Sequence, residues 1–130
     1  GYESRHNLKY WRCEEYLGIG PSAHSFLGGQ RFFFDRDVSA FIEKAEQGRF
    51  CTIPDGIGGG FEEEVMLGLR LTKGINKLEL SKKYNKETKK VLHRIPRFEK
   101  MGLIAAEGEN IRLTRKGFLL SNAIITELLY

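Results

Sequence analysis

The string His6-Asn7-Leu8-Lys9-Tyr10-Trp11 places a histidine close to two large aromatic side chains. An imidazole nitrogen can ligate heme iron, and indole and phenol rings offer flat apolar surface to a porphyrin. A structural alternative exists, in which the histidine and asparagine bond to the backbone of a turn while the aromatic rings fill a core. Residue types alone favour that alternative. The candidates for contact with heme or another tetrapyrrole are His6, Asn7, Tyr10 and Trp11.

A second candidate lies in residues 18–25, whose spacing GxGxxA is that of a dinucleotide-binding loop. We reject that function, because residues 15–17 are too short and polar for a buried strand and no acidic residue follows about 20 positions later in a βαβ unit. Two glycines instead let the backbone approach a ligand or a neighbouring strand closely. A barrel strand ending here would place the loop at a ligand face, although a tight structural loop explains the same residues. The ligand-loop candidates are Gly18, Gly20, Ser22 and His24.

Other catalytic patterns are missing from the sequence, which has no Ser-His-Asp order, paired helical carboxylates, HExxH or P-loop. Cys13 and Cys51 are too far apart for a CxxC metal site. No apolar run approaches the roughly 20 residues that cross a bilayer, and residues 1–7 contain no apolar signal region. We therefore expect no complete active site in these residues, and we expect a cytoplasmic protein because nothing in them directs export.

Positive charge is concentrated in residues 82–100, which carry eight basic and two acidic side chains in a chain whose net charge is +4. A basic helix can bind nucleic acid through its phosphates. The residues that would do so are Lys89, Lys90, Arg94 and Arg97. The alternative is a solvated helix face, which is the more common origin of such a cluster.

The elements that must position these side chains differ before and after a glycine-rich break at residues 54–60. We expect this break to be a linker or exposed loop, because glycine and proline weaken both helices and strands. Before it, the chain is aromatic and irregular, with a short strand at 32–34 after a glycine turn. One helix is expected from Asp37 to about residue 47, ended by Gly48.

After the break the pattern is regular. We expect a helix at 61–72, a short helix capped by Asn76, and a third helix from 85 or 86 to 101. Val91, Ile95 and Phe98 form the apolar face of the third helix, and Pro96 should kink or split it. A hairpin pairs 103–106 with 111–113. Thr114 then caps a last helix, 115–129, whose inward face is Phe118, Leu119, Ile125 and Leu128. This order predicts an α+β chain with a winged-helix-like domain.

Taken together, these residues resemble a known family. The strings at 6–11 and 16–26, followed by Glu64-Val65-Met66-Leu67-Gly68-Leu69-Arg70-Leu71, Gly102-Leu103-Ile104 and Leu113-Thr114-Arg115-Lys116-Gly117, are similar to the oxygen-independent coproporphyrinogen III oxidase-like radical S-adenosylmethionine family. The resemblance covers nearly the whole chain. The His-Asn-x-x-Tyr-Trp string is typical of the heme-chaperone branch more than of the oxidase.

The resemblance implies a parent protein with an N-terminal radical-SAM barrel, in which a CxxxCxxC motif binds a 4Fe-4S cluster and S-adenosylmethionine. That motif is absent here, so the chain holds no cluster ligands or catalytic residues and cannot perform the reaction unaided. Residues 1–28 would be the end of the barrel, 29–60 a connecting segment with one helix and the linker, and 61–130 the winged-helix-like domain. In the chaperone branch, the 6–11 string is associated with heme binding.

Three functions remain open. The chain is the C-terminal part of a heme chaperone or of an oxidoreductase resembling coproporphyrinogen III oxidase, where it covers its own barrel and helps to hold a tetrapyrrole. Alternatively, it is a winged-helix module that binds nucleic acid, which we regard as the weaker hypothesis. The third alternative is a purely structural docking domain that binds no ligand.

Overall fold

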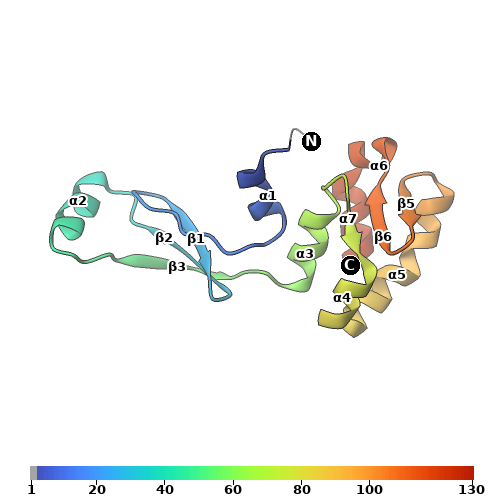
Figure 1. The fold of residues 1–130 in the computed structure, drawn as a ribbon, viewed down its shortest axis with the longest axis horizontal. Helices are drawn as coiled ribbons and strands as arrows, with labels where there is room; N and C mark the ends of the chain where they lie inside the picture. Colours follow the sequence, from blue (N-terminus) through green and yellow to red (C-terminus); the bar gives the residue numbers. More distant parts are fainter. Residues whose placement is uncertain (1–2) are drawn as a thin grey trace. The chain divides into compact units, whose positions relative to one another are not determined.

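The computed structural model describes residues 3–130, and the chain divides into two compact units, Gly1–Gly60 (unit 1) and Phe61–Tyr130 (unit 2). Each unit contains helices and a small antiparallel sheet (Figure 1). The expected mixed α+β class is therefore confirmed. Within residues 3–130, the helices are all too short or too polar to cross a membrane.

Unit 1 contains a three-stranded antiparallel sheet in the order β1-β2-β3. The φ angles of 57° and 72° at Gly28 and Gly29 form the tight turn between β1 and β2, a conformation that glycine adopts without strain. The expected strand at 32–34 and the helix capped by Asp37 are both confirmed. The elements are α1 (Arg5–Trp11), β1 (His24–Leu27), β2 (Gln30–Phe34), α2 (Val38–Glu46) and β3 (Thr52–Ile57).

The strand β3 corrects one expectation, because the linker or loop predicted from residue 54 onward begins inside a strand. β3 lies at the edge of the sheet, where a proline costs no ladder hydrogen bond on the solvent side. Its pairing with β2 shifts register between Gln30 and Phe32, and Gly56 takes a φ of 96°. This irregularity accommodates Pro54 and Gly56 in an edge strand, which a regular central strand would not allow.

The buried apolar side chains of unit 1, among its described residues, are Phe26 and Phe34. Phe34 packs edge-on against Phe41 of α2 and against Phe50, with ring centroids 5.6 and 6.1 Å away. These aromatic contacts hold α2 against the end of the sheet. The described strand pairs of this unit are antiparallel, so an origin of residues 1–28 in a barrel stays a prediction.

Unit 2 folds around one apolar core and a second small sheet, in which β6 lies between β4 and β5. The expected hairpin is present, and the two-residue strand β4 adds to it without having been predicted. Val91, Ile95 and Phe98 are buried as expected. The elements are α3 (Phe61–Gly68), β4 (Ile75–Asn76), α4 (Lys77–Lys83), α5 (Asn85–Lys100), β5 (Ile104–Glu107), β6 (Asn110–Leu113), α6 (Arg115–Leu119) and α7 (Ser121–Leu129).

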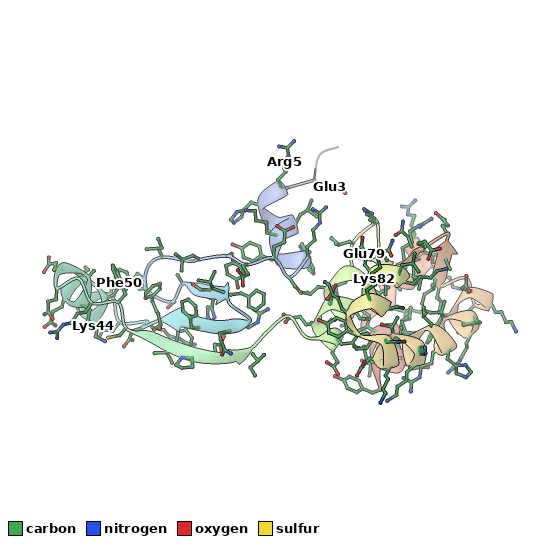
Figure 2. All side chains as sticks on the ribbon, turned by 60° about the horizontal axis from the view of Figure 1, so that its bottom comes forward. Glu3, Arg5, Lys44, Phe50, Glu79 and Lys82 are labelled. Carbon is green, nitrogen blue, oxygen red and sulfur yellow. The ribbon has the colours of Figure 1, made fainter. Side chains whose placement is uncertain are left out.

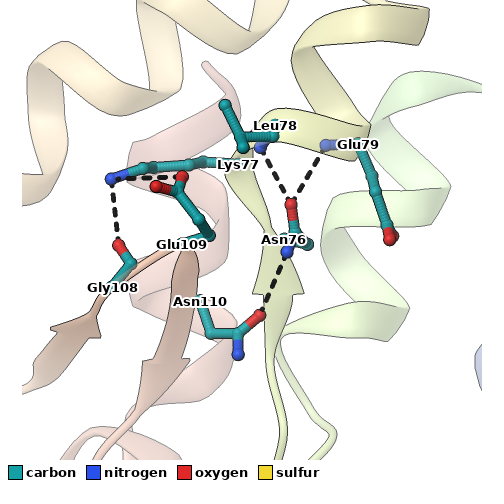
Figure 3. Close-up of polar contacts among 7 residues, drawn as sticks. All are labelled: Asn76, Lys77, Leu78, Glu79, Gly108, Glu109 and Asn110. Carbon is teal, nitrogen blue, oxygen red and sulfur yellow. Dashed lines mark hydrogen bonds and ion pairs between the residues drawn. The ribbon is translucent and has the colours of Figure 1, made fainter.

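Asn76 caps α4 as predicted and also connects the helix to the sheet (Figure 3). Its Oδ1 accepts hydrogen bonds from the N–H groups of Leu78 and Glu79, at 3.0 and 3.1 Å. Its Nδ2 donates to Oδ1 of Asn110 in β6 at 3.5 Å. The cap therefore fixes the start of α4 and the register of β4 together.

Three helix boundaries differ from the expectation. The helix expected at 61–72 is α3, which ends at Gly68. Beyond Gly68 the backbone forms tight turns, each closed by a hydrogen bond to the residue three positions earlier, such as that from the Leu71 N–H to the Gly68 carbonyl at 3.0 Å. The long helix α5 continues through Pro96 to Lys100, so it is not split there, and the alternative of a kink at Pro96 stays a prediction. The last helix divides at Leu120 into α6 and α7.

The division at Leu120 also overturns part of the predicted inward face. Phe118 and Leu119 are 53% and 85% exposed, whereas Ile125 and Leu128 are buried as expected. The cause lies at Gly117, where a Cβ would clash with the backbone carbonyl oxygen of Leu103. This close approach presses the Gly117 side of α6 against the chain before β5, which turns the following two side chains outward.

Candidate functional site

The first set of candidates lies on α1. Oγ of Ser4 accepts a hydrogen bond from the N–H of Asn7 at 3.3 Å and caps the helix. At about 100° per residue, His6 and Tyr10 form one stripe of this helix and Asn7 and Trp11 the neighbouring stripe. The structure therefore places the four candidates on one broad face of α1.

The two aromatic candidates on this face do not fill a core. Tyr10 and Trp11 are each 39% exposed, and no residue of α1 is buried within the described chain. Within residues 3–130 the two rings are therefore not the core residues that the structural alternative expected. Contact of these rings with a tetrapyrrole stays a prediction.

His6 and Tyr10 form a hydrogen-bonded pair, with 3.1 Å between Nε2 of the imidazole and the phenol oxygen. The rings meet edge-on, with centroids 5.2 Å apart. Tyr10 in turn packs against Tyr16 with centroids 4.5 Å apart. A metal ligand needs an imidazole nitrogen with a free lone pair, so ligation through Nε2 requires the Tyr10 hydroxyl to give way.

The second set of candidates lies in the loop before β1, and its glycines serve the fold. A Cβ at Gly18 would clash with the carbonyl oxygen of His24, so a neighbouring strand accounts for this glycine without a ligand. Oγ of the buried Ser25 accepts a hydrogen bond from the Gly18 N–H at 3.1 Å. Gly20 has a φ of 122° and its carbonyl accepts from the Ala23 N–H at 3.0 Å, which makes a tight turn.

The other two loop candidates also have partners in unit 1. Ser22 adopts a φ of 61°, and its N–H donates to the Asp35 carbonyl at 3.2 Å. His24 lies 3.1 Å from Asp55 through Nδ1, and its ring stacks on Phe33 with centroids 5.1 Å apart. Both side chains of the His24–Asp55 pair are about half exposed. The arrangement is an exposed histidine–carboxylate pair on the sheet.

Asp55 is not among the candidates from the sequence, because it lies in the segment interpreted there as a linker. Only the sheet register brings it near, since β2 pairs with both β1 and β3. The two candidate sets are connected through Tyr16, which contacts Tyr10 and forms an isolated bridge with Phe26 of β1. The loop candidates thus support the segment that follows α1.

The chain does not fit an iron–sulfur cluster of the kind that the resemblance implies. Across the described residues, no group of three or more His, Cys, Asp or Glu side chains could hold a metal ion. Cys13 and Cys51 are the only cysteines in the sequence, which leaves fewer thiolates than a cluster needs. No step of a radical reaction is assigned to these residues.

The basic stripe on α5 is partly used inside unit 2. Nη1 of Arg94 donates to the carbonyl oxygens of Glu127 and Leu128 at 2.9 and 3.0 Å, which satisfies the C-terminal turn of α7. Nη1 of Arg97 pairs with the Glu127 carboxylate at 3.0 Å. Two of the four cations that would contact phosphates therefore already have partners, which weakens the nucleic-acid hypothesis.

Residues 61–120 match the model of the family described as the HemN C-terminal domain. Curated relatives extend the similarity over both units. The chain is 33% identical to a heme chaperone HemW of Bacillus subtilis over 95% of this chain and 34% of that protein. It is 30% identical to the HemW of Lactococcus lactis, over 99% of this chain and 35% of that protein.

A HemW of Mycobacterium tuberculosis is also 30% identical, over 99% of this chain and 32% of the relative. The chain therefore spans about a third of the length of the curated relatives it matches. Among solved structures, the coproporphyrinogen III oxidase HemN from Escherichia coli, described as a radical SAM enzyme, has a similar fold. The TM-score is 0.55 at 18% identity, covering 89% of this chain and 28% of that one.

Proposed function

We propose a function on the premise that this chain belongs to the HemN-like family, as a region homologous to the C-terminal part of HemW heme chaperones. In this proposal the chain is the C-terminal part of a heme chaperone. It helps to hold a tetrapyrrole and catalyses no reaction by itself. The similarity to HemW relatives that spans 99% of the chain, and so includes α1, carries this proposal.

The tetrapyrrole contact is assigned to α1. Its His6 supplies an exposed imidazole, and Trp11 supplies an exposed flat ring on the neighbouring stripe. Imidazole is a common heme ligand, and aromatic faces pack against porphyrin. The loop candidates have structural partners, so we assign them a supporting role beneath Tyr16 and not direct ligand contact.

Unit 2 is proposed to act as a winged-helix-like cover for a radical-SAM barrel elsewhere in the protein. The order of α3, α4, α5 and the β5–β6 hairpin supports the winged-helix organisation. A 4Fe-4S cluster and S-adenosylmethionine, where the complete protein uses them, would be held outside this chain, because it lacks the cysteines. The relatives' names favour chaperone over oxidase for the complete protein.

A hemin titration followed by Soret absorbance tests the proposal. We expect saturable binding at one equivalent by the 130-residue chain and its loss in His6→Ala. His93→Ala is the matched control, since His93 is also an exposed histidine but lies on α5 in unit 2. Equal binding by all three proteins would refute the assignment to α1, and the absence of any Soret shift would favour a purely structural docking domain.

A further inference from the structure

We propose that α1 recognises its ligand partly by charge, with Arg5 and Lys9 binding carboxylate groups at the edge of a tetrapyrrole whose ring contacts His6. This inference rests on the proposed function and adds two residues of α1, Arg5 and Lys9, that distinguish a ring with free carboxylates from one without them. The esterified or uncharged form of the same ring is then a poor ligand.

The spacing of the residues brings Lys9 next to the histidine and Arg5 next to Lys9. Arg5 and Lys9 are four residues apart and lie on one stripe of α1, and Lys9 follows His6 by three positions. On a helix, side chains three or four positions apart are neighbours, with Cβ atoms about 5–6 Å apart. Lys9 therefore borders His6 on one side, while Tyr10 borders it on the other.

The basic stripe lines an open pocket of about 490 Å³. Leu8 provides an apolar surface in this pocket, and charged groups surround it. In Figure 2, Arg5 extends outward from α1 near Glu3. His6 does not line this pocket, so the pocket receives the carboxylate arms of the ligand and the ring lies beside it on His6. The lining residues are Glu3, Arg5, Leu8, Lys9, Arg12 and Glu14.

The cations of the pocket differ in their availability. Arg12 is paired with Glu14 at 3.9 Å, so part of its charge is already balanced. Arg5 and Lys9 make no ion pair or side-chain hydrogen bond with other residues of the described range 3–130. A guanidinium and an ammonium without partners are suited to charge-assisted hydrogen bonds with carboxylates.

The test compares hemin with hemin dimethyl ester, which keeps the ring and the iron but lacks free carboxylates. The unaltered 130-residue chain should bind hemin about tenfold more tightly than the ester, the gain expected of one or two charge-assisted bonds. In the double variant Arg5→Gln/Lys9→Gln, hemin affinity should fall to that of the ester, and ester affinity should stay unchanged. Added salt should weaken hemin binding by the unaltered chain but not by Arg5→Gln/Lys9→Gln.

Lys89→Gln/Lys90→Gln is the matched control, since it removes the same charge from exposed positions on α5. It should leave both affinities unchanged. Equal affinity of the unaltered chain for hemin and ester, with no effect of Arg5→Gln/Lys9→Gln, would overturn this inference and leave heme binding through His6 intact. Failure of both compounds to bind would overturn the proposed function together with it.

Discussion

Replacing Gly117 with alanine should destabilise unit 2, although the same change in an ordinary exposed helix would stabilise it. Gly117 lies in α6, where a Cβ would meet the carbonyl oxygen of Leu103. That carbonyl is held in place, because it accepts a hydrogen bond from the Thr114 N–H at 3.0 Å. Oγ1 of Thr114 also donates to the Gly102 carbonyl at 2.8 Å and accepts from the Gly117 N–H at 3.0 Å.

The clash is between the added Cβ, which is fixed to the backbone of α6, and the backbone carbonyl oxygen of Leu103. Neither atom can rotate away as the end of a flexible side chain would. A helical Gly→Ala change contributes about 1 kcal/mol in favour of folding through helix propensity. Forcing an extra methyl group into a tightly packed place costs about 1–3 kcal/mol, and at this site α6 or the chain before β5 must move as well. We take the upper end of that range, so the expected net loss in free energy of unfolding is about 2 kcal/mol.

Urea unfolding followed by circular dichroism measures the loss, and amide hydrogen exchange in β5 and β6 assigns it to unit 2. The control is Gly108→Ala, in the hairpin turn, where a Cβ has nothing within 4 Å but the backbone has a φ of 59°. Its cost is the left-handed strain alone, about 1 kcal/mol. An unchanged or raised stability of Gly117→Ala would refute the reasoning, since it would show that α6 slides away from Leu103 without cost.

Two further predictions concern a hydrogen bond and an ion pair. Tyr10→Phe keeps the ring beside Tyr16 and removes the hydroxyl bonded to His6 Nε2, so hemin affinity by Soret titration should rise about two- to tenfold if Nε2 is the ligand; a fall would show instead that the hydroxyl orients the ring. In unit 2, the hydrogen bond from Lys83 to Glu64 at 2.8 Å raises the pKa of Lys83 above 10.5. The stabilising contribution of this pair should therefore be complete below pH 10.5 and disappear as the pH rises through the higher folded-state value. Urea unfolding of the unaltered chain and Lys83→Gln at pH 8 and pH 11.5 measures it, and an equal difference at both would contradict the assignment.

Local signals in the sequence predicted the helix starts and the main apolar face correctly. Asp37, Asn76 and Thr114 each accept a backbone N–H at the helix that follows, because a short polar side chain can reach that group without help from the rest of the fold. The apolar spacing of Val91 and Ile95 likewise reflects a helix period that needs no distant partner.

Features that depend on distant contacts were not predictable in this way. Pro54 lies in a strand because β2 offers it an edge, and the last helix divides near Leu120 because Gly117 packs against Leu103. In the candidate site, His6 pairs with Tyr10 because α1 is a helix, where an irregular segment had been expected. Asp55 reaches His24 only through the register of the sheet.

The order of strands in unit 2 has a consequence for how the chain folds in time. The β5–β6 hairpin closes over a two-residue turn, whereas β4 must pair with β6 across the whole of α4 and α5, with Ile75 opposite Ile111. Local closure costs less chain entropy than distant closure, so the hairpin can form early and β4 must join it late. The last contact to form is then the one at Gly74, whose Cβ position meets the Ile111 carbonyl. A side chain at this position would act on the final step of assembly and leave the earlier hairpin intact.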